Sequence, residues 1–186
     1  AAVANGLKEI GFSEHLTLFR GSLDWSMDAS DVKPYLNHIN SLVRSVSGLK
    51  VRKGLEVDFL PGKEKDIWSL LKKTNIDYAI GLVHYLGDFP VDTGPEFYDG
   101  RNIDNLFETY FEQVIAATAS GLFDIIAHCD LIRIYGFKPS SDPEILYRKL
   151  ARSFKIHDVA FEINTNGRNR LVGDFYPDRK YLRIFM

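Results

Sequence analysis

Residues 77–85 read DYAIGLVHY, and residues 123–131 read FDIIAHCDL. Each stretch is a short apolar run with no polar face, and each run is followed directly by a histidine. A strand that is apolar on both faces is typical of a parallel sheet, because the crossover helices cover both faces of such a sheet. The two stretches therefore predict buried parallel strands over residues 76–84 and 123–128.

The segments around these strands alternate between strand-like and helix-like patterns. Further short apolar runs predict strands at 9–12, 52–59 and 159–163. Apolar residues at helical spacing predict helices over 30–47, 63–74 and 103–120, and Asp142-Pro143 begins a fourth, because proline suits the first helical turn. Strand alternating with helix over this length predicts an α/β fold with a parallel sheet or barrel.

Composition narrows the class of protein. The chain has 186 residues, which suits a single domain over 1–186, and an apolar share of 45% is too high for a disordered chain. No run of about 18 apolar residues is present to span a bilayer. With 23 basic and 25 acidic side chains the formal charge is -2, which argues against binding to nucleic acid or an anionic membrane through electrostatic attraction.

The single cysteine, Cys129, excludes an internal disulfide and indicates a reducing compartment such as the cytoplasm. Strand alternation predicts that its side chain points into the core, opposite His128 and Asp130, as a small buried hydrophobe. The other two histidines outside the strand ends are His38, within an expected helix, and His157, expected in the loop after the last helix. We expect both to be dispensable.

The expected strands finish in potential metal ligands. They are Glu14 with His15, Glu56 with Asp58, His84, His128 with Asp130, and Glu162 with Asn164. Any one of these histidines is more often a structural residue, but the carboxyl ends of parallel strands converge on one rim. Imidazoles with carboxylates suit zinc or another divalent transition metal. The pattern predicts a cluster of two or three metals, most often used to hydrolyse a phosphate ester.

Five motifs follow one another along the chain: GFSEH at 11–15, GLEVDF at 54–59, DYAIGLVHY at 77–85, FDIIAHCDL at 123–131 and FEINTNG at 161–167. Together they resemble the histidinol-phosphatase branch of the polymerase-and-histidinol-phosphatase (PHP) superfamily. The resemblance implies a distorted β/α barrel, usually of seven strands, with up to three zinc, manganese or iron ions at the carboxyl rim. It also implies hydrolysis of L-histidinol phosphate to L-histidinol and phosphate, in histidine biosynthesis.

The same resemblance implies roles for individual metal-site residues. His15 matches a ligand, Glu56 matches the carboxylate that bridges two metals, and His84 and His128 match ligands of the third metal. Asp130 completes the family's H-x-D-L motif, where it either supports the ligands or handles a proton.

For the substrate, Arg168 is the first candidate for a phosphate clamp and Arg133 the second, because a guanidinium group suits phosphate oxygens bidentately. Glu162 is the candidate partner for the substrate ammonium. The expected partner is thus a small phosphate monoester, with no nucleic acid and no membrane, and the oligomeric state stays open.

Two family motifs are not found in these 186 residues: the opening H-x-H and the closing D-x-H, usually G-S-D-A-H. Both ends of the sequence read as interrupted helices, so we expect a barrel that is incomplete at both termini. Two alternatives therefore stay open. One is another PHP phosphoesterase or exonuclease, and the other is a non-catalytic PHP chain that keeps the barrel without the chemistry.

Overall fold

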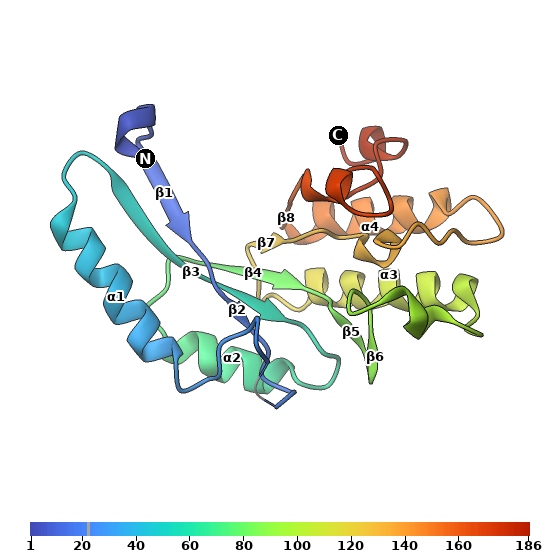
Figure 1. Ribbon diagram of the computed structural model, residues 1–186, viewed down its shortest axis with the longest axis horizontal. Coiled ribbons are helices and arrows are strands. Elements are labelled where there is room, and N and C mark those ends of the chain that lie inside the picture. The colour runs from blue at the N-terminus through green and yellow to red at the C-terminus, as the bar shows by residue number, and fades with distance from the viewer. Residues whose placement is uncertain (22) are drawn as a thin grey trace.

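A curled parallel sheet organises the computed structural model, which describes residues 1–21 and 23–186 (Figure 1). Its main path runs β1-β3-β4-β7-β8, with β2 also paired to β3, and every pair in it is parallel. The strands are β1 (Glu9–Phe12), β2 (His15–Leu16), β3 (Lys50–Asp58), β4 (Tyr78–Leu82), β7 (Ile125–Ile126) and β8 (Ala160–Phe161). A short antiparallel pair, β5 (Tyr85–Leu86) and β6 (Phe89–Pro90), follows β4.

In the described part of the chain, four α-helices connect the strands. They are α1 (Val32–Ser45), α2 (Glu64–Lys73), α3 (Ile103–Ala119) and α4 (Glu144–His157). Figure 1 shows α1 and α2 along one flank of β3, and α3 beside α4 at the other end of the sheet. Short 3-10 helices lie at Val3–Asn5, Pro95–Tyr98, Leu131–Arg133, Asn166–Asn169 and Leu182–Ile184. The predicted α/β class with a parallel sheet is confirmed.

Strands form at all five predicted positions, but four of them end before the predicted residue. β4 stops at Leu82 and β7 at Ile126, short of the histidines in which the predicted strands ended. The reason is a change of hydrogen-bond partner: the backbone N–H of His84 donates to Asp58, and that of His128 donates to Glu162. Side-chain carboxylates thus replace the strand-to-strand backbone hydrogen bonds at the residues where the polar side chains begin.

The predicted helices also form, with one correction at the C-terminal end of α4. His157 is the last residue of that helix rather than part of a following loop. The helix continues to this point because Asp158 adopts the left-handed conformation, φ 55°, that ends a helix, and its N–H bonds back to Phe154.

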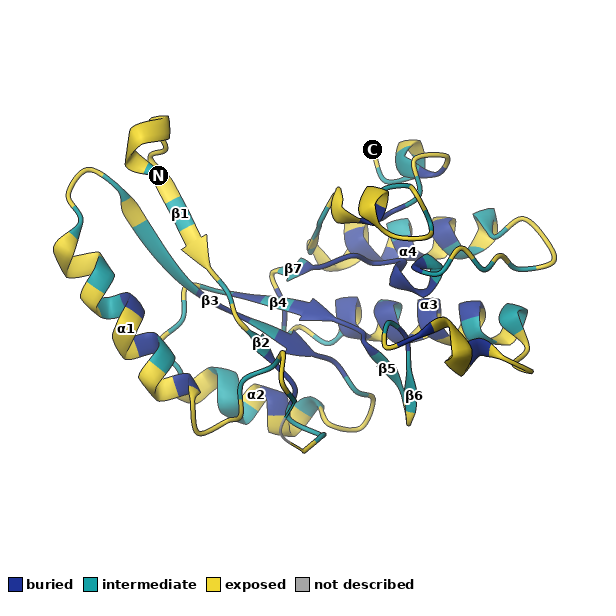
Figure 2. Ribbon diagram, viewed as in Figure 1, coloured by how far each residue is buried: buried dark blue, intermediate teal, exposed yellow. Residues whose placement is uncertain are grey.

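The core lies between the sheet and the helices, and Figure 2 shows the buried residues along the central strands and the facing sides of α3 and α4. Close packing requires a glycine in β4, since a Cβ at Gly81 would lie 2.5 Å from the Phe123 ring. Cys129 is fully buried in this core, as predicted, and burial raises the pKa of its thiol. None of the helices described is long and apolar enough to cross a membrane.

Candidate active site

Three histidines lie in a row at one rim of the parallel sheet. His15 begins β2 opposite Glu56 of β3, while His84 and His128 follow β4 and β7. The ring centroids of His15 and His84 are 5.5 Å apart, and those of His84 and His128 are 5.3 Å apart. The parallel register therefore brings together residues separated by more than a hundred positions in the sequence.

Glu56 places a carboxylate beside this row. Its Oε1 lies 3.9 Å from Nδ1 of His15, and its side chain is largely buried. Burial, followed by the charge of Glu162, raises the pKa of Glu56 to about 7. A carboxyl group whose ionised form is disfavoured in this way is stabilised as the anion by an incoming cation.

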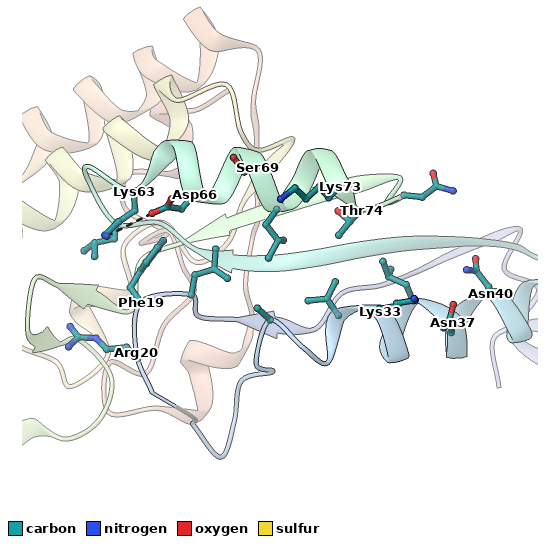
Figure 3. A pocket seen from close by; sticks show the side chains of 17 residues that line it. Phe19, Arg20, Lys33, Asn37, Asn40, Lys63, Asp66, Ser69, Lys73 and Thr74 are labelled. Carbon is teal, nitrogen blue, oxygen red and sulfur yellow. Dashed lines mark ion pairs between the residues drawn. The ribbon is translucent and has the colours of Figure 1, made fainter.

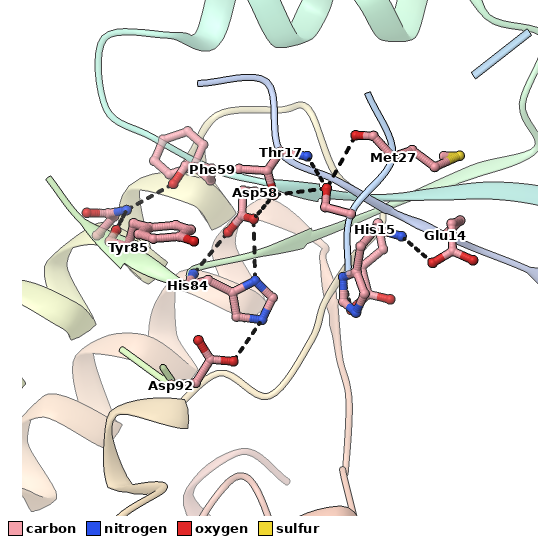
Figure 4. A network of polar contacts seen from close by, with 12 residues as sticks. Glu14, His15, Thr17, Met27, Asp58, Phe59, His84, Tyr85 and Asp92 are labelled. Atoms are coloured by element: carbon pink, nitrogen blue, oxygen red, sulfur yellow. Dashed lines mark hydrogen bonds and ion pairs between the residues drawn. The ribbon is translucent and has the colours of Figure 1, made fainter. Parts of the chain in front are cut away.

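His84 is held by a carboxylate on the neighbouring strand (Figure 4). Its Nδ1 lies 3.3 Å from Oδ2 of Asp58, and its backbone N–H donates to Oδ1 of the same carboxylate at 3.0 Å. On the other side of the ring, Nε2 lies 3.9 Å from Oδ2 of Asp92. Burial disfavours the imidazolium form, but the hydrogen bond and charge of Asp58 outweigh it and raise the pKa of His84.

His128 is the most constrained of the three. Its backbone has a positive φ of 25°, an uncommon conformation for a residue other than glycine, and its N–H donates to Oε2 of Glu162 at 2.9 Å. Burial and the neighbouring His84 and His15 lower the pKa of His128 to about 3. Burial and His84 likewise lower the pKa of His15. Both shifts favour the neutral imidazole, which is the form that binds metals.

The residues fit a metal ion in their chemistry. Nδ1 of His15 and Nδ1 of His128 are buried without a hydrogen-bond partner in the described part of the chain, although buried polar atoms are normally satisfied. An imidazole nitrogen in that situation is a donor that an ion can use. Among residues 1–21 and 23–186, however, no three His, Cys, Asp or Glu side chains converge closely enough to hold an ion as they stand.

Asp130 lies at the centre of a second polar cluster. It is fully buried, and its Oδ2 accepts from Tyr147 Oη at 2.6 Å, from Arg133 Nη1 at 2.9 Å and from the backbone N–H of Asp178 at 2.8 Å. Burial raises the pKa of Asp130 despite the nearby guanidinium. Arg133 also pairs with Asp178 at 2.9 Å and lies 3.7 Å from Asp174. Its donors are thus directed at groups of the protein itself.

The other predicted substrate residues are placed differently. Glu162 lies against His128 and also accepts from Asn164 Nδ2 at 3.0 Å, so it belongs to the histidine row. Arg168 is exposed in the 3-10 helix Asn166–Asn169, with its guanidinium 5.8 Å from the Phe175 ring. His38 and His157 are exposed on α1 and at the end of α4.

Two residues of the site were not anticipated from the sequence. The Trp25 ring contacts both His15 and His84, with centroids 5.6 Å and 5.1 Å apart, and Asp92 faces His84. Asp92 carried a weak signal as an acidic residue in the aromatic-rich loop at 89–102. Trp25 carried none, because its segment has no periodic pattern.

One cavity lies beside the histidine row, and a larger one lies away from it. A cavity of about 390 Å³ adjoins the histidine row through Asp92 and is also lined by Tyr135 and Arg170. A larger one, of about 1150 Å³, lies between α1 and α2 and includes none of the candidate ligands (Figure 3). The candidate active site is the histidine row, because the candidate metal ligands lie there and none of them lines the larger cavity.

Comparison with known proteins gives the family, since the PHP domain matches over residues 1–166. The chain belongs to the PHP domain family. A probable histidinol-phosphatase of Deinococcus radiodurans is 36% identical over 183 residues, which are 95% of this chain and 69% of that protein. A histidinol-phosphatase of Lactococcus lactis is 27% identical over 190 residues, with 95% and 68% covered. The resemblance to PHP histidinol-phosphatases is thereby confirmed.

Solved structures agree on the fold. A crystal structure from Listeria monocytogenes, a candidate histidinol phosphatase, superposes with a TM-score of 0.84 at 22% identity, over 99% of this chain and 81% of that one. The Lactococcus lactis histidinol phosphate phosphatase, in complex with zinc, L-histidinol and phosphate, gives a TM-score of 0.77 at 22% identity, over 99% and 71%. The curled parallel sheet is therefore that of the distorted PHP barrel.

Proposed function

We propose that this chain is a metal-dependent phosphomonoesterase that hydrolyses L-histidinol phosphate to L-histidinol and phosphate in histidine biosynthesis. The carrying observation is the row of three histidines beside Glu56, found in a PHP chain whose similar curated proteins are named histidinol-phosphatases. The Lactococcus structure, which contains zinc, L-histidinol and phosphate, supports the same substrate class.

In this proposal His15, Glu56, His84 and His128 hold the divalent ions, of which the complete family site has up to three, as zinc, manganese or iron. When bound, such ions polarise the phosphate and supply a hydroxide nucleophile at neutral pH. The chain's own contribution is to keep the imidazoles neutral, which burial favours at His15 and His128, and to keep Glu56 where a cation stabilises its charge.

The remaining residues act on the substrate or support the site. Arg168, whose exposed guanidinium contacts only the Phe175 ring among its described interactions, is proposed to clamp the phosphate. Glu162, beside His128, is proposed to face the ammonium. For Asp130 we favour support of the site over direct proton transfer, because the residue is fully buried and three donors occupy its Oδ2.

The proposed partner is a small phosphate monoester rather than nucleic acid, supported by the formal charge of -2 and by the modest cavity beside Asp92. The proposed compartment is the cytoplasm, supported by the single unpaired cysteine, Cys129. A second candidate function is that of a non-catalytic PHP chain. It is favoured by the lack of convergence of three ligands among the described residues.

Phosphate release from L-histidinol phosphate tests the proposal. The purified chain is stripped with a chelator, and zinc, manganese or iron is added back one at a time. We expect turnover only with metal, and its loss in His128→Asn, which retains a residue that tolerates positive φ. Faster release from an oligonucleotide would place the chain among the nucleases, and metal binding without turnover of either substrate would favour the non-catalytic candidate.

A further inference from the structure

One buried carboxylate in the site has contacts that decide the protonation of a neighbouring imidazole. We propose that Asp58 is a positioning residue: it accepts the Nδ1–H of His84, which fixes the neutral tautomer and leaves the Nε2 lone pair free for a metal ion. The role toward the metal rests on the proposed function, whereas the tautomer is a property of the chain by itself.

Asp58 holds His84 at two points. Oδ2 lies 3.3 Å from Nδ1 of the ring, and Oδ1 accepts the backbone N–H of the same residue at 3.0 Å. Asp58 is 4% exposed and His84 5% exposed, so water does not compete for these contacts. Because the backbone N–H is a fixed donor, the carboxylate cannot turn without losing one of the two contacts.

The carboxylate is itself held from behind by the segment that follows β2. Thr17 Oγ1 donates to Oδ2 of Asp58 at 2.6 Å. Ser26 Oγ lies 3.2 Å from Thr17 Oγ1 and accepts the backbone N–H of Thr17 at 2.9 Å, which orients the threonine. Both oxygens of Asp58 thus accept hydrogen bonds, Oδ1 from the His84 backbone N–H and Oδ2 from Thr17 Oγ1, so we assign the hydrogen between Asp58 and His84 to the imidazole.

The opposite nitrogen has a weaker competitor. Oδ2 of Asp92 lies 3.9 Å from Nε2, beyond hydrogen-bond distance, and the Asp92 side chain is 34% exposed. The Trp25 ring, 5.1 Å from the His84 ring between centroids, packs against the imidazole from a further side. The geometry therefore favours the proton on Nδ1 and leaves Nε2 as the donor atom.

This arrangement serves metal binding. A metal ligand must be a neutral imidazole, and a carboxylate on the other ring nitrogen fixes its tautomer and raises its basicity. The strand register supplies that carboxylate, because Asp58 of β3 pairs with Leu82, two residues before His84.

Nitrogen-15 NMR of the metal-free full chain tests the tautomer directly. The spectrum is recorded at about pH 9, where an ordinary histidine is neutral. The His84 signals are identified by their loss in His84→Gln. We expect the Nδ1–H form, and a predominant Nε2–H form would overturn the inference without the need for any variant at Asp58.

Asp58→Asn sharpens the test. The backbone N–H of His84 requires the amide oxygen at the Oδ1 position, which puts the amide NH₂ opposite Nδ1 and forces the proton to Nε2. We expect the tautomer to switch and zinc affinity, measured by chelator competition, to fall by about 10–100-fold. Retention of the Nδ1–H form with wild-type zinc affinity would refute the role of Asp58.

Two variants control for general disturbance. Asp92→Asn should leave the tautomer unchanged, because its contact with Nε2 is long. Thr17→Val keeps the carboxylate and should retain the Nδ1–H form, with a smaller loss of zinc affinity than Asp58→Asn. A switch of tautomer in Asp92→Asn, with none in Asp58→Asn, would assign the role to Asp92.

The outcome can be separated from that of the proposed function. An Nδ1–H tautomer in a chain that releases no phosphate from L-histidinol phosphate would remove the function and keep the role of Asp58 in setting the tautomer. An Nε2–H tautomer in a chain with full turnover would do the reverse.

Discussion

The two arginines that the sequence offered as phosphate candidates differ in the contacts that their side chains make. Arg133 is largely buried and holds Asp130 and Asp178 at 2.9 Å each, and it also donates to the carbonyl of Phe175 at 3.1 Å. Arg168 is exposed, and its described contact is with the Phe175 ring. A guanidinium that neutralises buried carboxylates is needed by the fold, whereas an exposed one can meet a ligand.

Replacing each of the two arginines by alanine should therefore change the free energy of unfolding by different amounts. Arg133→Ala leaves the fully buried Asp130 without its counter-charge, and we expect a loss of about 3–5 kcal/mol in the free energy of unfolding, measured with denaturant. Arg168→Ala should change the same quantity by less than about 0.5 kcal/mol, as for other exposed positions. An Arg133→Ala variant as stable as the wild type would contradict the structural role.

Phosphatase activity, in contrast to stability, should depend on Arg168. If Arg168 clamps the phosphate, Arg168→Ala should reduce kcat/KM on histidinol phosphate at least tenfold, about 1.4 kcal/mol or more, with metal content unchanged. Arg168→Lys should recover only part of the loss, because lysine lacks the planar fork. Equal activity of Arg168→Ala and the wild type would remove Arg168 from the site.

The exposed histidines provide matched controls for the histidine row of the site. His38 and His157 lie on the outer surfaces of α1 and α4. We expect His38→Gln and His157→Gln to keep phosphatase activity within about threefold, which is about 0.7 kcal/mol. A loss of several hundredfold in either, with folding intact, would show that the active rim has been misplaced.

Single residues were predictable where a short motif carries the chemistry. His84 and His128 follow apolar strands, His15 begins β2, and the structure brings all three together. The part played by Asp58 was not predictable, because its contact with His84 depends on the register between β3 and β4. The sequence offered Arg133 as the second candidate for a phosphate clamp but could not reveal that Asp174 and Asp178 lie beside it.

At the scale of elements, the ends of the strands rather than their middles position the candidate ligands. The carboxylates of Asp58 and Glu162 accept the backbone N–H groups of His84 and His128, which ends two strands, and Asp58 also contacts the imidazole of His84. Sequence patterns located both of these strands but predicted their ends at His84 and His128, two residues too late, because the apolar residues continue past the last strand-to-strand hydrogen bond. Helix ends were closer, apart from His157.

Gln113 ties α3 to the same rim. Its Nε2 donates to the carbonyls of Phe59 at 2.9 Å and Tyr85 at 2.8 Å, just beyond the ends of β3 and β4. Gln113→Leu leaves both carbonyls without that donor, and we expect a loss of about 2–4 kcal/mol in unfolding free energy. The neighbouring Glu112 is exposed, so Glu112→Gln is the control. Equal midpoints of denaturant unfolding for Gln113→Leu and the wild type would show that these bonds contribute little.

At the scale of the whole molecule, the candidate ligands belong to four segments of one curled sheet. His15 lies on β2, Glu56 on β3, and His84 and His128 follow β4 and β7. They share a rim only when the parallel sheet is formed, so the unfolded chain does not present them together. The sequence could predict this convergence from topology alone, but not the distances, which depend on how strongly the sheet curls.

Metal binding should therefore appear as stability of the whole chain. An ion that binds only the folded state stabilises it by about 2.7 kcal/mol at a concentration 100 times its Kd. For a chain of this size that corresponds to a rise of about 5–10 °C in Tm. We expect zinc to raise Tm by this order, a chelator to reverse the rise, and His38→Gln to respond as the wild type does. His128→Asn should lose most of the rise, since asparagine tolerates the backbone at φ 25° and the variant lacks only the imidazole. An equal rise in His128→Asn and the wild type would mean that zinc binds elsewhere, and the histidine row would lose its assignment as the metal site.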